Sequence, residues 1–139
     1  MARRILFAAL FTITTVLFVE VAHAEIFAAG PVYGGNLAEL TGAVVTVRVF
    51  NAGLAPVTIN LTQILTNTNS LIALTSNTCL SPPNAALAAA RYCAFAGVSP
   101  GNFAFSCRLN ATGIDTNLRG VCEVRGTSGR ILSVEPLQR

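Results

Sequence analysis

The 139-residue sequence contains no lysine and no tryptophan, and its one histidine is His23. Charged residues make up only 11% of the chain, and the formal net charge is +3. Nucleic-acid-binding domains usually carry a strongly basic surface, so this small surplus argues against nucleic acid as a partner. A chain that is rich in alanine and free of lysine is typical of a GC-rich bacterial genome, which favours a bacterial source.

The N-terminal segment has the three regions of a secretory signal peptide. Two arginines stand near its start, Ile5–Val19 is an apolar run without charge, and Ala22–Ala24 has the small-x-small pattern of a cleavage site. The apolar run is shorter than the roughly 18 to 20 residues that a membrane-spanning helix needs. We therefore predict a signal peptide at residues 1–24, a mature chain from Glu25 in the periplasm or outside the cell, and no stable membrane insertion after cleavage.

Cleavage would also remove His23, leaving a mature chain with neither histidine nor lysine and a net charge of 7 − 5 = +2 from seven arginines and five acids. Nucleophilic catalysis of the Ser-His-Asp or Cys-His kind needs a base that titrates near neutral pH. Among the acids, Asp115 in a loop and Glu123 and Glu135 on outward or late strand positions are expected to serve surface solubility. Gly30–Gly35 lacks the lysine and helix of a phosphate loop and is expected to be a flexible approach to the first strand. We predict no enzyme, no catalytic residues and no cofactor.

The four cysteines all follow the predicted leader, and an even count in an oxidising compartment indicates two disulfides. Their spacing does not resemble the short Cys-x-x-Cys pairs of zinc or redox sites, so we predict no metal site. Three pairings are possible by count alone. The cysteines are Cys79, Cys93, Cys107 and Cys122.

Alternation of apolar and polar residues with a period of two recurs along the chain and predicts half-buried strands. Ala43–Phe50 and Val57–Ile64 alternate cleanly, and Asn51–Pro56 between them contains Asn, Gly and Pro, which predicts an antiparallel hairpin. Ala85–Tyr92 fits either a short helix or the approach to a strand. Further strands are predicted at Leu71–Leu74, Tyr92–Phe95, Asn102–Leu109, Leu118–Arg125 and Arg130–Glu135.

About seven short strands without a long helical stretch predict one all-β domain over residues 25–139, a sandwich of immunoglobulin-like type. Because tryptophan is absent, the likeness to antibody domains is architectural only. Cys107 and Cys122 lie on the apolar faces of their strands, which predicts a hairpin with Phe105 beside Val124 and Ser106 beside Glu123. The remaining cysteines, Cys79 and Cys93, then pair by elimination.

The segment Val45–Ile59, VTVRVFNAGLAPVTI, resembles the hairpin of bacterial Ig-like domains related to the abnormal-spindle/SPD-2/Hydin superfamily. Cys79 and the later Leu87–Cys93 are similar to that group's spaced cysteine pair. Small exported bacterial proteins with one such sandwich have a late Arg-Gly strand similar to Leu118–Val124. The resemblance implies a fold and carries over no catalytic residue. In Ala88–Arg91 the sequence departs from the Pro-Gly turn that is usual in the superfamily.

These observations favour an exported, non-catalytic binding or structural module of the bacterial cell envelope, whose partner is an unidentified protein or envelope component. The alternatives are a self-assembling fibre or coat subunit and a secreted enzyme or inhibitor. Arg108, Arg119 and Arg125 are predicted to share the outer face of one hairpin, offset by Glu123, where they form either a solvated face or a site for an anionic surface.

Overall fold

The computed structural model describes residues 23–32, 41–80, 86–101, 103–113 and 117–139, and none of these residues lies in a helix. All of the regular elements are strands, as the period-two alternation of the sequence predicts. They are β1 (His23–Val32), β2 (Val44–Asn51), β3 (Val57–Thr66), β4 (Leu74–Asn77), β5 (Ala86–Leu87), β6 (Tyr92–Val98), β7 (Phe105–Gly113), β8 (Leu118–Arg125) and β9 (Ile131–Pro136).

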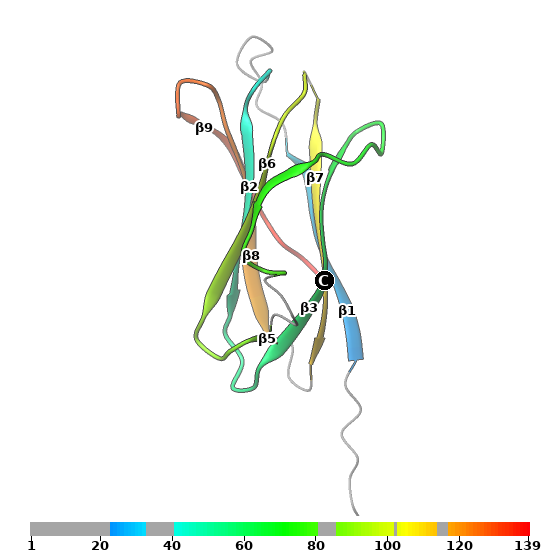
Figure 1. Cartoon of the computed structure of the whole chain (residues 1–139), viewed down its shortest axis with the longest axis vertical. Helices are drawn as coiled ribbons and strands as arrows, with labels where there is room; N and C mark the ends of the chain where they lie inside the picture. Colours follow the sequence, from blue (N-terminus) through cyan, green and yellow to red (C-terminus); the bar gives the residue numbers. More distant parts are fainter. Residues whose placement is uncertain (1–22, 33–40, 81–85, 102, 114–116) are drawn as a thin grey trace, which may run out of the picture.

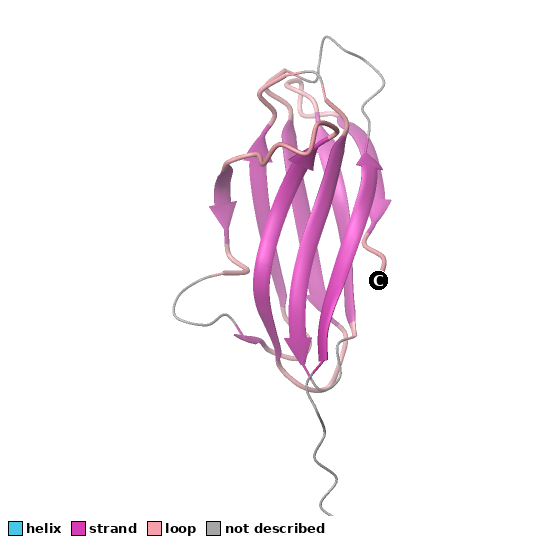
Figure 2. Ribbon diagram, turned by 90° about the vertical axis from the view of Figure 1, so that its right-hand side faces the viewer, coloured by secondary structure: helices cyan, strands magenta, loops and turns pink. Residues whose placement is uncertain are grey.

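The strands form two antiparallel sheets that lie face to face (Figures 1 and 2). The four-stranded sheet has the order β1-β7-β3-β5 and the five-stranded sheet the order β4-β6-β2-β8-β9. From β1 to β8, consecutive strands alternate between the sheets, so each connection crosses from one layer to the other. The predicted all-β sandwich is confirmed, with nine strands among the described residues where about seven were predicted, and its immunoglobulin-like type stays a prediction.

The hairpin predicted between β2 and β3 is wrong, because these two strands lie in different sheets. Asn51 ends β2 and is fully buried, and its side-chain amide donates hydrogen bonds to the carbonyl oxygens of Ala55 at 2.9 Å and Leu87 at 2.8 Å. Its Oδ1 accepts a hydrogen bond from the backbone N–H of Gly53 at 2.9 Å. These three bonds satisfy the buried amide and hold the segment that crosses between the layers.

Both disulfides that the sequence predicts are present, namely Cys79–Cys93 and Cys107–Cys122. The hairpin predicted to carry the second bridge is wrong, because that bridge joins β7 of one sheet to β8 of the other. The register with Phe105 beside Val124 and Ser106 beside Glu123 therefore does not occur. Two apolar strand faces can meet either side by side in one sheet or across the core of a sandwich, and alternation alone does not distinguish these arrangements.

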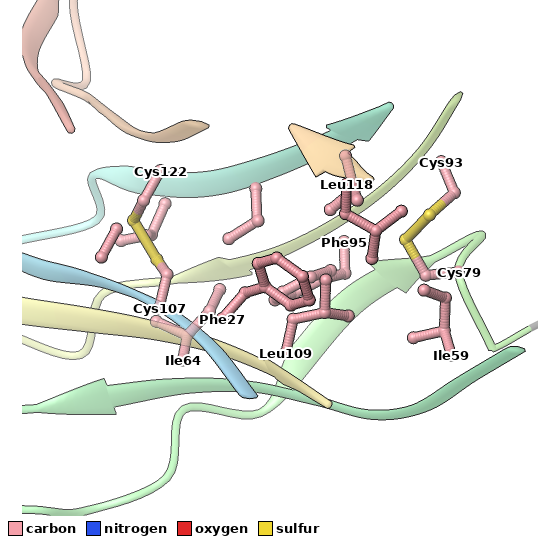
Figure 3. Packing of buried hydrophobic residues seen from close by; sticks show 14 of the residues in the cluster. Phe27, Ile59, Ile64, Cys79, Cys93, Phe95, Cys107, Leu109, Leu118 and Cys122 are labelled. Carbon is pink, nitrogen blue, oxygen red and sulfur yellow. A yellow bond between two sulfur atoms is a disulfide. The ribbon is translucent and has the colours of Figure 1, made fainter. Parts of the chain in front are cut away.

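The inward-facing side chains of both sheets form one continuous core (Figure 3). Phe95 of β6 and Phe105 of β7 are its largest fully buried side chains. The bridge between Cys107 and Cys122 crosses this core, so a covalent link joins the two layers where their apolar faces meet. The other bridge lies within the five-stranded side, tying the turn after β4 to β6.

The strand boundaries in the middle of the chain differ from the prediction by a few residues. The strand expected at Leu71–Leu74 begins only at Leu74, where β4 starts. Of the two alternatives for residues 85–92, the approach to a strand is confirmed: β5 is followed by a turn in which Ala90 adopts a left-handed φ of 57°, and β6 begins at Tyr92.

β1 and the two-residue β5 are strands that the sequence did not predict, and β1 is the longer of the two. It includes Gly30–Val32, so the flexible approach expected over Gly30–Gly35 is wrong there, and residues 33–35 lie outside the described residues. Gly30 has a φ of 139°, and a Cβ at this position would lie 2.9 Å from the carbonyl oxygen of Phe105. Only glycine combines this conformation with so close an approach of the neighbouring strand.

The predicted cleavage site lies inside β1, where Ala24 pairs with Thr112 of β7. A chain cleaved there keeps Glu25, whose carboxylate lies 2.9 Å from Nε of Arg139. One residue before that arginine, Gln138 exchanges two backbone hydrogen bonds of 2.8 Å with Ala28. The C-terminal tail, which follows β9, therefore joins the five-stranded sheet to the edge strand of the four-stranded sheet.

Candidate binding face of the five-stranded sheet

The outer face of the five-stranded sheet is built by the residues of β2, β6 and β8 that alternate with the core positions. In β2 the core side chains lie at Val45, Val47 and Val49, so the residues between them and the following Phe50 point outward. The register places Phe50 opposite Tyr92 of β6 on one side and opposite Arg119 of β8 on the other. One row across three strands therefore presents two aromatic rings and a guanidinium.

Exposed large apolar side chains stand at both ends of this face and on the edge strand β9. Tyr92 is 77% exposed and Phe50 is 42% exposed, although both lie on strands in the interior of the sheet. Phe50 and Tyr92 are directly opposed, and adjacent exposed aromatic side chains on a soluble domain commonly mark a place where another molecule binds. The other large apolar side chains exposed on these strands are Val44, Val98, Ile131 and Val134.

Glu123 lies on the same outer face but is buried to 5% exposure. Its carboxylate accepts hydrogen bonds from Nη1 of Arg48 at 3.1 Å and from Nε of Arg125 at 2.5 Å. Arg125 also donates to the carbonyl oxygen of Gly129 at 3.1 Å. The carboxylate thus fixes two guanidinium groups in place, and charge-assisted hydrogen bonds of this kind are stronger than neutral ones.

The predicted cluster of Arg108, Arg119 and Arg125 on one hairpin is wrong. Arg108 lies on β7 in the other sheet, opposite Ala28 of β1, because β7 and β8 are not paired. Arg119 and Arg125 do share one face, as residues of β8. The third arginine of that face is Arg48 from β2.

A hollow in this face lies beside the aromatic row. Its volume is about 370 Å³, within the range of small-molecule sites, and it is open to solvent. We call it the Phe50–Tyr92 hollow. It is lined by Arg48, Val49, Phe50, Tyr92, Arg119, Gly120 and Val121.

Arg119 has no hydrogen-bond or ion-pair partner among the described residues, whereas Arg48 is held by Glu123. Three arginines and one glutamate on the outer faces of β2 and β8 leave a local charge of 3 − 1 = +2. The sequence predicted that Glu123 offsets the charge of this face. In the structure its carboxylate pairs with two of the three arginines, Arg48 and Arg125. Among the residues that the structure describes, no acidic side chain is paired with Arg119 beside the aromatic rings.

The remaining candidate residues of the sequence are found as follows. All four cysteines are in disulfides and none is free. Glu135 is exposed on β9, and Asp115 lies outside the described residues. Within the described ranges, no group of three or more potential ligand side chains is placed to hold a metal ion. In the same ranges, a search for helices of sufficient length and hydropathy to cross a bilayer finds none.

Comparison with protein-family models, with curated proteins and with solved structures finds no match to this chain. Its site must therefore be interpreted from its own residues.

Phe50, Tyr92 and Arg48 were not predicted from the sequence as members of one site. The sequence does contain the pattern that would identify them. In the alternation of β2, Phe50 falls on the same side of the strand as Arg48, which is the polar side. Tyr92, next to the buried Cys93, is likewise on the outward parity of β6. An aromatic residue on an outward strand position is a candidate for binding.

Replacement of Glu123 by glutamine is expected to lower the free energy of unfolding by roughly 1–2 kcal/mol, because it removes the charge that two guanidinium groups share. The effect stays below that of a fully buried ion pair, since the side chains of Arg48 and Arg125 are 51% and 40% exposed and water can solvate them. Urea unfolding measures the change, with Glu135→Gln as the control at an exposed acid. Equal effects of the two variants would contradict a structural role for the Glu123 carboxylate.

Proposed function

We propose that this chain is an exported, non-catalytic binding module of the bacterial cell envelope, and that it binds its partner through the outer face of the five-stranded sheet. The observation that carries the proposal is the exposed row formed by Tyr92, Phe50 and Arg119. Tyrosine and arginine are enriched among the residues that dominate binding energy at interfaces. A rigid sheet holds them in place before the partner arrives, which reduces the ordering cost of binding.

The disulfides support the location. Two buried bridges persist in oxidising compartments such as the periplasm and the cell exterior, whereas cytosolic thiols are kept reduced. The leader-like segment at residues 1–24 agrees with export. A mature chain that begins at Glu25 would carry no histidine and no lysine, which favours binding over catalysis.

The proposal is tested by expressing the full chain in a bacterium with a photo-crosslinking amino acid at one position. At Tyr92 we expect export, a mature N-terminus at Glu25 by mass spectrometry, and an adduct with an envelope component. The matched control carries the same group at Arg108, which is exposed on the four-stranded sheet, and should give no adduct. Retention in the cytosol with an intact leader, or adducts of equal yield from both positions, would contradict the proposal.

The same exposed apolar face also favours a second candidate, a self-assembling subunit. In that case the Tyr92 adduct would be a dimer of this chain, and size-exclusion chromatography would give oligomers that Tyr92→Ser reduces to monomers. A monomer at all concentrations, with a heterologous adduct, would exclude self-assembly.

A further inference from the structure

The Phe50–Tyr92 hollow joins an apolar wall to a positive charge. Phe50 and Tyr92 are directly opposed on neighbouring antiparallel strands, where Cβ atoms lie roughly 4.5–5.5 Å apart, so the two side chains are adjacent. Aromatic faces carry partial negative charge and attract polarised C–H groups. A ring-shaped ligand with C–H bonds on one face fits this wall.

The positive side of the hollow comes from β8 and β2. Arg119 pairs with Phe50 in the strand register, so its guanidinium group emerges next to the aromatic wall. Its five N–H donors form a planar fork that matches a carboxylate. Arg48 also lines the hollow and is held by Glu123 at 3.1 Å, so part of its position is fixed before any ligand binds.

We propose that the Phe50–Tyr92 hollow binds an acidic sugar residue, with the C–H face of the ring against Tyr92 and Phe50 and the sugar carboxylate on Arg119. This inference rests on the proposed function and names the class of envelope component that the face recognises, a polysaccharide with uronic-acid-type residues. Among the described residues, Arg119 is the arginine of this face that is left to pair with the ligand's anion, because Arg48 and Arg125 are both paired with the Glu123 carboxylate.

The shape of the site favours a saccharide over an anionic membrane. A lipid surface is contacted by side chains that protrude together, whereas here Arg48, Arg119 and the two aromatic rings border a shallow, open hollow of about 370 Å³. A sugar ring enters such a concavity and stays partly hydrated, which suits a site that is open to solvent. Binding to vesicles but not to sugars would therefore overturn the proposal.

The test uses trigalacturonate as the acidic probe and its methyl ester as the matched neutral probe, with binding to the purified, disulfide-bonded protein measured by calorimetry. We expect the acid to bind and the ester to bind at least about tenfold more weakly, because the ester removes the charge that Arg119 recognises. Arg119→Gln and Tyr92→Ala should each weaken binding of the acid by about tenfold or more. Arg119→Lys should give an intermediate loss, since lysine keeps the charge and lacks the fork.

The matched control is Arg108→Gln, which removes one exposed arginine from the opposite sheet and should leave the affinity unchanged. The circular-dichroism spectrum and melting temperature of each variant establish that it is folded, and Phe50→Leu provides a second variant that keeps the apolar volume while it removes the ring. Equal losses from Arg108→Gln and Arg119→Gln would reduce the binding to general charge attraction and overturn the proposal, as would equal affinity for acid and ester.

The outcome for the hollow is separable from that for the proposed function. Absence of trigalacturonate binding together with an envelope adduct at Tyr92 would overturn the acidic-sugar ligand and leave the binding module in place. Binding only to vesicles of phosphatidylcholine and phosphatidylglycerol would likewise overturn the sugar and identify a lipid surface instead. Absence of both sugar binding and adduct would remove both proposals.

Discussion

Replacing all four cysteines by alanine is expected to lower the free energy of unfolding by roughly 6 kcal/mol, about 3 kcal/mol for each bridge. The two loops that the bridges close are nearly equal, with sequence separations of 14 and 15, so the chain-entropy contribution is the same for both. A domain of this size has a total stability of about 5–15 kcal/mol. The variant without cysteines should therefore be largely unfolded at 37 °C.

The measurement is urea unfolding of the oxidised protein, of each paired variant and of the variant that lacks all four cysteines. The pairs Cys79→Ala with Cys93→Ala and Cys107→Ala with Cys122→Ala serve as controls for each other. Because the second bridge joins the two sheets, we expect its loss also to expose the core between them, which raises binding of a hydrophobic dye. A total loss below about 1 kcal/mol would mean that packing alone holds the sandwich.

The strands were predictable because alternation depends on a local property, the side of the sheet to which each side chain points. The prediction for Leu118–Arg125 coincides with β8, and those for β2 and β3 differ from the structure by one or two residues. The pairing of Cys107 with Cys122 was predicted from their inward-facing positions together with a hairpin that does not form, and the pairing of Cys79 with Cys93 followed by elimination. The strand predictions use only whether a residue faces the core.

The order of the strands was not predictable. A side chain that faces the core has the same place in the alternation whether its partner lies on the next strand of the same sheet or across the core on the other sheet. Cys107 and Cys122 could form a disulfide in either arrangement, and the short segment with turn-forming residues between them suggested a hairpin. The structure resolves the choice through connections that cross between the layers, as at Asn51, whose amide bonds hold such a crossing. Nothing in the sequence of the connecting segments identifies them as crossings.

β1 was missed for a different reason. Its residues begin shortly after the apolar run Ile5–Val19. The composition of this region therefore indicates the predicted cleavage site but does not indicate a strand after it. Small residues occupy much of Glu25–Val32, and the buried Phe27 and Ala29 make only a weak alternation. The partner strand β7 supplies the pairing that makes this segment a strand.

The candidate site depends on strand order even more than the fold does. Parity alone places Phe50, Tyr92 and Arg119 on outward positions of three separate strands. Only the order β6-β2-β8 brings them into one row. Within the described part of the chain, Glu123 pairs with Arg48 and Arg125 and leaves Arg119 without an ion-pair partner. A face of this kind is recognised after the sheet has been assembled.

Phe95→Ala is expected to lower the free energy of unfolding by about 3–5 kcal/mol, because it opens a cavity in the core that the neighbours fill only in part. Phe95 is fully buried on β6, paired with Val47 of β2 and Asn77 of β4. Figure 3 shows its ring among the inward side chains of the cluster, which come from both sheets. Its loss therefore weakens contacts between the layers as well as within one.

Phe50→Ala is the matched control, since it removes the same ring from the neighbouring strand but on the outer face, where the side chain is 42% exposed. This variant should lose no more than about 1 kcal/mol of stability, because water already reaches much of the ring. Paired urea titrations thus separate the two faces of the sheet: the inner phenylalanine determines stability and the outer one affects ligand binding. Equal destabilisation by the two variants would mean that the outer face is covered in solution, and would redirect attention to self-assembly.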